Sequence, residues 1–178
     1  PTMSSDTTEL TIIDAATRIR FTAYSHELSA AFGWLFMLIV VHWLRAHGIR
    51  HHIRIQGDNG AEFCRGSKAK ELELNNLLNP LGSSFISIPA GKKYLQALVE
   101  NSHRHDDEQF LSIHPIRCYN DRSFIGKAQR WQDTWNAARR SQGIGMENRT
   151  PLEKLRQKDN LIHSHIIQFP VILMEDIL

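Results

Sequence analysis

The sequence predicts the α/β class, with a mixed sheet flanked by helices. Segments with strand and helix periodicity alternate along its first half, and long amphipathic helical segments fill much of the second half. At 178 residues and 42% hydrophobic content, the chain can close the core of one domain of ordinary size. A Rossmann fold is excluded because no GxGxxG motif follows the first predicted strand.

The first elements are two strands and a long helix. LTIIDAATRIRFTAY, from Leu10 to Tyr24, is rich in β-branched and aromatic residues and breaks at Asp14-Ala15-Ala16, which predicts two strands joined by a tight turn. Residues 25–48 predict one helix, with Ser25 as its N-cap and Gly48 as its terminator. Its apolar run, residues 30–44, is shorter than the roughly 20 residues a bilayer requires, so we expect a buried helix and not a membrane span.

The middle of the chain predicts two further strands around a short helix. IRIQG, residues 53–57, alternates apolar and polar residues and ends directly before Asp58. Residues 71–78 predict a helix that is stopped by Asn79-Pro80. Residues 84–88 alternate again, and Pro89 ends that strand.

Two helices follow. Residues 94–111 place Leu95, Leu98 and Val99 on an inward face and leave Glu100, His103, Arg104 and Asp107 on the polar face. Residues 121–140 carry a stripe that we expect to lie in the core, formed by Phe124, Ala128, Trp131 and Trp135.

The C-terminal part is expected to complete the domain. Arg139 and Arg140 are interpreted as cations at the end of the preceding helix, although they could bind phosphate instead. Residues 161–178 are largely apolar and interrupted by Pro170. We therefore expect a core of residues 1–160 and a C-terminal extension, residues 161–178, that packs on it.

Charge balance, cysteine content and the first residues bear on the partners and the cellular compartment of the chain. Lys and Arg number 21 against 19 Asp and Glu, and the pI is near 8.8, which allows a nucleic-acid partner without requiring one. Cys64 and Cys118 form no CxxC pair, so neither a zinc ribbon nor a disulfide framework is indicated and a reducing compartment is expected. The first residues, PTMSSDTTE, do not have the pattern of a signal peptide.

Asp58 and Glu100 are candidate metal ligands. Phosphoryl transfer on a polynucleotide often depends on two Mg²⁺ or Mn²⁺ ions, which prefer carboxylate oxygens held on rigid elements. Asp58 follows a strand end and Glu100 lies on a helix. Each has an ordinary alternative, because Asp-Asn-Gly is a common turn and Glu100 could form a surface ion pair with Arg104.

Four segments carry a family resemblance: QGDNGAEF, VENSHRHDDEQF, TWNAARR and TPLEKL, in this order. From about Asp6 to Leu155, the chain resembles the catalytic core of the DDE-type integrases and transposases, which includes retroviral integrases and bacterial insertion-sequence transposases. The resemblance implies an RNase H-like fold, Mg²⁺ or Mn²⁺ as cofactor, and DNA strand cleavage and strand transfer. A catalytically degenerate DNA-binding or assembly module, and an RNase H-like nuclease, are the alternatives.

The resemblance also implies residue roles. Asp58 matches the second acid of the family and Glu100 the third, while Asp6 is the first acid, with Asp14 as the alternative. Lys92 and Lys93, in the loop before the helix of Glu100, and His103 and Arg104 are expected to contact DNA, although each lysine could equally be ordinary surface charge.

The implied partners are mobile-element ends and target DNA, and a homodimer is plausible for a protein that acts on paired ends. The expected location is the bacterial cytoplasm, at the nucleoid. No helix-turn-helix is evident in the sequence, so it resembles an isolated core. The zinc-binding module of retroviral integrases is also not evident.

Overall fold

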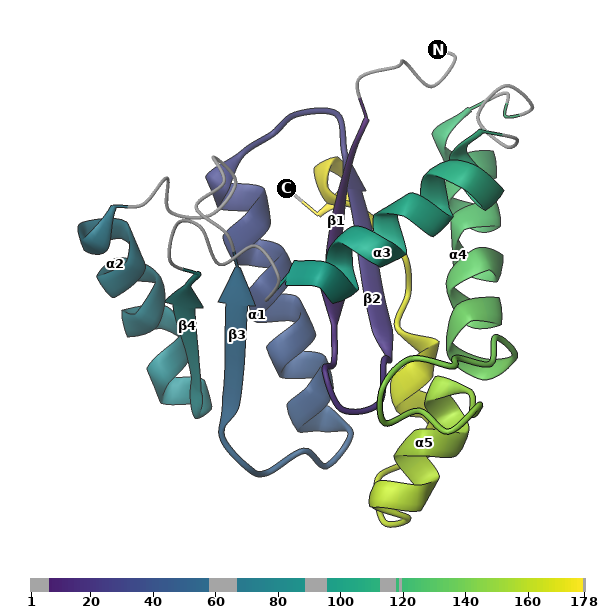
Figure 1. The fold of residues 1–178 in the computed structure, drawn as a ribbon. Helices are drawn as coiled ribbons and strands as arrows, with labels where there is room; N and C mark the ends of the chain where they lie inside the picture. The colour runs from purple at the N-terminus through teal and green to yellow at the C-terminus, as the bar shows by residue number, and fades with distance from the viewer. Residues whose placement is uncertain (1–6, 58–66, 89–95, 113–117, 119, 178) are drawn as a thin grey trace. The chain divides into compact units, whose positions relative to one another are not determined.

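The computed structural model describes residues 7–57, 67–88, 96–112, 118 and 120–177. The chain divides into two compact units, which are described separately here. One is contiguous and comprises Glu27–Ala97, and the other combines Pro1–His26 with Leu98–Leu178. Both contain strands and helices, so the chain belongs to the α/β class as predicted (Figure 1).

The discontinuous unit is built on a β-hairpin. Strand β1, Thr8–Ile13, pairs antiparallel with β2, Arg20–Ser25, from Thr8 opposite Ser25 to Ile13 opposite Arg20. The predicted break at Asp14 is confirmed as the turn, where the Asp14 carboxylate accepts hydrogen bonds from the backbone N–H (2.7 Å) and the hydroxyl (2.6 Å) of Thr17.

A short strand near the C-terminus joins this hairpin. Strand β5, Ile172–Leu173, pairs parallel with β2, which makes β2 the central strand of three among the described residues. All six residues of β2 are buried. The sheet therefore contains both antiparallel and parallel pairing, as the predicted mixed sheet requires.

Helices α3 (Ala97–Asp106), α4 (Asp121–Ala137) and α5 (Pro151–Lys158) belong to the same unit. In Figure 1, α3 crosses the hairpin, and a wide helical turn, Asp107–Leu111, continues it. The core contains side chains from the sheet, this turn, α4 and the residues just before α4 and β5: Tyr24, Phe110, Cys118, Phe124, Ala128, Val171 and Leu173.

Two buried side-chain amides of α4, those of Asn136 and Gln132, form hydrogen bonds with the backbone of β2 and of the segment before β5. The Asn136 carboxamide accepts a hydrogen bond from the backbone N–H of Arg20 (2.9 Å) and donates one to the carbonyl oxygen of Arg20 (2.9 Å). Gln132 donates to the carbonyl oxygen of Phe169 (2.7 Å). These bonds satisfy the backbone of β2 and of the segment before β5, which would otherwise be buried without partners.

The contiguous unit contains α1 (Ala30–Ala46), β3 (Ile53–Gly57), α2 (Lys68–Leu78) and β4 (Ser83–Ser87). Strands β3 and β4 pair parallel, and α2 lies between them in sequence and packs against β4 (Figure 1). Parallel neighbours require such a crossover connection.

One arginine ties the ends of these elements together. Arg45, in the last turn of α1, donates hydrogen bonds to the carbonyl oxygens of Ile49 (2.8 Å), His51 (2.8 Å), Leu81 (2.9 Å) and Gly82 (2.8 Å). The first two carbonyls precede β3 and the other two precede β4. A single guanidinium therefore fixes the entry to both strands.

Two predicted helix boundaries are wrong. Ser25 is the last residue of β2, so it cannot cap a helix, and α1 begins at Ala30 with Ser29 as its N-cap. Helix α4 ends at Ala137, before Arg139 and Arg140. None of the helices in the described ranges combines the length and the apolar character that crossing a bilayer would require.

Candidate functional site

Four of the predicted site residues, Asp6, Asp58, Lys92 and Lys93, lie outside the described residues. The described chain places the end of β3 at Gly57, the residue before Asp58. Glu100, His103 and Arg104 lie on α3. Glu100 belongs to one compact unit and β3 to the other, so each is considered by itself.

Glu100 lies in the first turn of α3 with an exposed side chain. Its carboxylate forms no hydrogen bond or ion pair with any other described residue. The predicted alternative, an ion pair with Arg104, is not formed, because Arg104 donates to Asn101 Oδ1 (2.8 Å) and pairs with Glu108 (3.8 Å). The Glu100 carboxylate is thus accessible to a cation from solvent.

His103 differs from Glu100 and Arg104, which are exposed on the same helix. Its side chain is half-buried, and burial lowers the pKa of its imidazole, while the charge of Asp106 acts in the opposite direction. The lowered pKa favours the neutral ring near pH 7. Arg104 is exposed and remains the permanent cation of this stretch.

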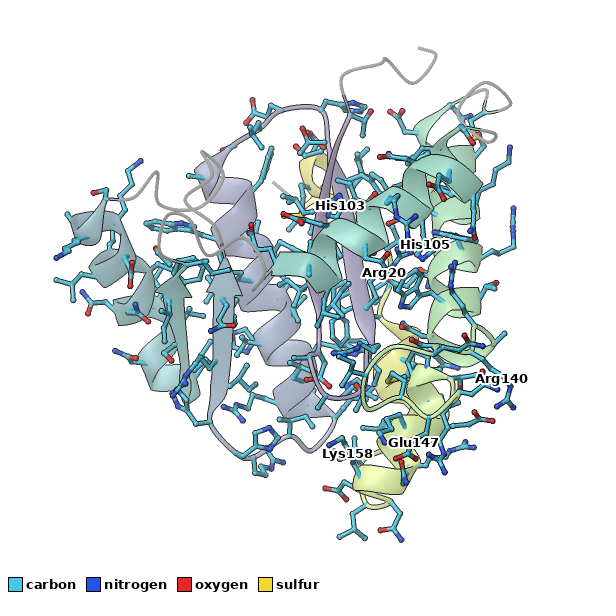
Figure 2. The ribbon with its side chains drawn as sticks, viewed as in Figure 1. Arg20, His103, His105, Arg140, Glu147 and Lys158 are labelled. Carbon is cyan, nitrogen blue, oxygen red and sulfur yellow. The ribbon has the colours of Figure 1, made fainter. Side chains whose placement is uncertain are left out.

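The opposite side of α3 is anchored by a buried ion pair. Nη1 of Arg20, on β2, lies 2.6 Å from both carboxylate oxygens of Asp106, and both side chains are 1% exposed. Asp106 also accepts hydrogen bonds from the indole N–H of Trp131 and from the Ser102 hydroxyl (3.5 Å). Figure 2 shows Arg20 beneath α3, with His103 and His105 along the helix.

A second carboxyl group lies next to this ion pair. Burial, followed by the negative charge of Asp106, raises the pKa of Glu9 from 4.5 to about 8, although Arg20 and a hydrogen bond from Thr11 (2.6 Å) act against the shift. Burial and the charge of Glu9 also raise the pKa of Tyr24 well above its ordinary value. Glu9 therefore keeps its proton near neutral pH.

Sequence reasoning missed this buried cluster, although a signal was present. The apolar stripe that includes Leu98 and Val99 continues at helical spacing to Ser102, Asp106 and Phe110. All three are buried, so the inward face of α3 changes from apolar to polar and back again. A carboxylate on a buried stripe requires a cationic partner, and Arg20 supplies it.

The remaining candidates have structural contacts. Asp14 uses its carboxylate in the hairpin turn. The side chains of Arg139 and Arg140 do not bond the last carbonyls of α4, although the backbone N–H of Arg139 donates to the carbonyl oxygen of Thr134 (2.8 Å). Arg139 donates to Gln109 Oε1 (3.0 Å), and Arg140 donates to the Asn148 carbonyl oxygen (2.8 Å) and Glu153 Oε1 (3.1 Å).

The two expected core tryptophans of α4 are half-buried. Trp131 stacks on Phe110, with ring centroids 5.9 Å apart. The ring of Trp135 contacts the guanidinium groups of Arg20 (4.5 Å) and Arg139 (4.9 Å). Both rings are thus occupied by protein contacts.

Within the described ranges, no three His, Cys, Asp or Glu side chains come together as a possible metal site. Two of the three predicted acidic ligands lie outside those ranges, so the predicted metal site stays a prediction. No family model matches the chain, and no curated protein matches its sequence. Its function is therefore inferred from its own residues.

Proposed function

We propose that the chain is the catalytic core of a DDE-type transposase or integrase, with an RNase H-like fold, that cleaves and joins DNA. The observation that carries the proposal is the state of Glu100. It occupies the position that resembles the third acid of the family, and its carboxylate is exposed and unpaired among the described residues. The ion pair of Arg20 with Asp106 holds the same helix to the sheet.

The order of elements gives further support. A β-hairpin is followed by α1, then by the parallel strands β3 and β4 with α2 between them, and then by α3. The end of β3 leads directly into Asp58. Side chains at the carboxyl ends of parallel strands are common ligand-binding positions in α/β proteins.

Asp6, Asp58 and Glu100 are the proposed ligands of two Mg²⁺ or Mn²⁺ ions. Carboxylate oxygens are the donors that these hard cations prefer, and Glu100 is accessible for this role. Such ions would lower the pKa of the attacking water or hydroxyl and stabilise the leaving oxygen. Asp14 is the weaker candidate for the first acid, because its carboxylate already accepts two hydrogen bonds in the hairpin turn.

The proposed DNA contacts are Lys92, Lys93, His103 and Arg104. Arg104 projects from α3 one turn after Glu100, with its side chain exposed. A permanent cation at this position would neutralise phosphate charge close to the scissile bond. The proposed substrates are mobile-element ends and target DNA, the proposed assembly is a homodimer, and the proposed location is the bacterial nucleoid.

The direct test is nicking of supercoiled plasmid in Mn²⁺ and in Mg²⁺ by the wild-type protein and by E100Q. The matched control is E73Q, the same substitution at an exposed side chain of α2. We expect E100Q and D58N to lose metal-dependent nicking and E73Q to retain it. Circular dichroism establishes that each variant is folded.

The rival functions give different results. A catalytically degenerate DNA-binding module would bind plasmid without nicking it in either metal. A nuclease without strand transfer would nick DNA but would not join a labelled 3′-hydroxyl oligonucleotide to the plasmid. Nicking by E100Q at the wild-type rate would exclude the assigned role of Glu100.

A further inference from the structure

A pocket in the discontinuous unit offers a binding site of a different kind. It has a volume of about 470 Å³ and lies among α3, the turn between β1 and β2, and the chain that follows α4. Its described lining includes Arg18, His105, Arg139 and Arg140, and no acidic side chain. In Figure 2, His105 faces α4 and Arg140 lies near the end of that helix.

Two of these guanidinium groups have no carboxylate partner among the described residues. Arg18 donates to carbonyl oxygens, including that of Ile144 (3.1 Å), and Arg139 donates to the amide oxygen of Gln109 (3.0 Å). Arg140 differs, because it pairs with Glu153 (3.1 Å). The pocket therefore carries positive charge that the described residues do not neutralise.

Arg139 is held in place and partly removed from water. Its guanidinium lies 4.9 Å from the centroid of the Trp135 ring, which also contacts Arg20 at 4.5 Å. Burial, and then the charge of Arg20, lowers the pKa of Arg139, while the charge of Asp106 acts in the opposite direction. Asp106 is already paired with Arg20, so the partly buried Arg139 has no counter-charge of its own among the described residues, and an anionic ligand would supply one.

We propose that this pocket binds a phosphate group, carried either by a free nucleotide or by a polynucleotide. Guanidinium groups present paired N–H donors that match phosphate oxygens. Burial, and then the charge of Arg139, lowers the pKa of His105, and its neutral imidazole offers one N–H donor. The volume exceeds that of a single phosphate, and Leu98 and Pro151 supply apolar wall for an attached group.

This site is separate from the proposed catalytic face of α3. The pocket is lined by Leu98, Asn101 and His105, which share one side of the helix. At about 100° per residue, the side chain of Glu100 lies roughly 160° from Leu98, about 100° from Asn101 and about 140° from His105 around the helix axis. Phosphate binding here therefore requires neither Glu100 nor a metal.

The test is isothermal titration calorimetry in EDTA at low ionic strength, with pyrophosphate, dTMP and the dinucleoside phosphate TpT as probes. R139Q and R18Q remove the two unpaired guanidinium groups. R122Q is the matched control, with the same loss of charge at an exposed arginine of α4 outside the pocket. Thermal unfolding of each variant tests its folding, and R18Q, in a surface turn, keeps the test valid if R139Q does not fold.

We expect pyrophosphate to bind the wild-type protein and R122Q equally, and R139Q and R18Q to bind it about tenfold more weakly, as loss of a charged hydrogen bond requires. Binding of dTMP alone identifies a phosphate monoester as the ligand, and binding of TpT identifies the polynucleotide backbone. Absence of pyrophosphate binding to the wild-type protein, or equal weakening in R122Q, would overturn the proposal. Because metal is absent throughout, loss of nicking by E100Q has no bearing on this result.

Discussion

The adjacent aspartates Asp106 and Asp107 allow a sharp test of the buried ion pair. Asp106 is fully buried against Arg20, whereas Asp107 is exposed on the next position of the same helical run. The same change, aspartate to asparagine, can therefore be made with and without burial. D106N removes the negative charge beside Arg20 and directs an amide N–H₂ group toward a guanidinium that has only donors.

The structure indicates a large effect for D106N. Both Asp106 oxygens lie 2.6 Å from Arg20 Nη1, and Oδ1 also accepts from Trp131. Arg20 Nε has no hydrogen-bond acceptor among the described residues, and the other acceptor of Nη1, the Ser102 hydroxyl at 3.4 Å, carries no charge to replace that of Asp106. Removing one partner of a buried pair typically costs roughly 3–5 kcal/mol, whereas an exposed substitution such as D107N changes stability by less than about 0.5 kcal/mol.

Urea unfolding followed by circular dichroism measures both variants against the wild-type protein. A third protein, R20M/D106L, replaces the pair by apolar side chains and should recover much of the loss, because no unpaired charge then remains buried. If D106N and D107N unfold within about 1 kcal/mol of each other, Asp106 does not anchor α3 as described.

Two other features give measurable predictions. Between pH 4.5 and about 8, Glu9 keeps its proton in the folded state and loses it in the unfolded state, so the free energy of unfolding should fall as pH rises across this range. E9Q should flatten that dependence in urea titrations at pH 5, 6.5 and 8, and an unchanged slope would contradict the raised pKa. R45K should lower the free energy of unfolding by roughly 1–3 kcal/mol, because a single ammonium group cannot donate to all four carbonyl oxygens that the guanidinium of Arg45 contacts. Hydrogen exchange at the Ile53 amide, which donates to Gly82, should accelerate in R45K and not in R50K, where the exposed Arg50 forms one long bond of 3.3 Å.

Periodicity in the sequence predicted the elements whose inward faces are apolar. The hairpin around Asp14, strand β3 and strand β4 were all found within a residue or two of their predicted positions. The N-terminus of α1 was misplaced because Ser25 resembles a helix cap, whereas its backbone pairs with Thr8. Local preference was overridden there by a strand partner distant in sequence.

The sequence did not predict which polar side chains are buried. Gln132 and Asn136 are polar, yet both are fully buried because they bond backbone groups of Phe169 and Arg20. Arg20 and Asp106, which are 86 positions apart in sequence, likewise become core residues only when the fold brings them together. Such partnerships depend on tertiary contacts, which neither propensity nor spacing encodes.

Within the candidate site, the sequence predicted the exposed face of α3 but not the buried ion pair between Arg20 and Asp106 that anchors this helix. Glu100 and Arg104 are exposed on that face, as the polar positions of an amphipathic helix should be. The cationic pocket was not predicted as a site. Arg139 and Arg140 were interpreted as part of a helix end, and the contribution of Arg18 depends on the hairpin lying near the chain after α4.

The pairing of β2 with β5 has a consequence for synthesis on the ribosome. Residues 27–97 form a contiguous unit and can fold while translation continues, but Ala23 finds its partner Ile172 only after almost 150 further residues have been added. Until then, one edge of β2 stays unpaired and the apolar side chains around Tyr24 stay exposed to solvent in the nascent chain. Emergence of β5 from the exit tunnel therefore sets the earliest moment at which this sheet can close.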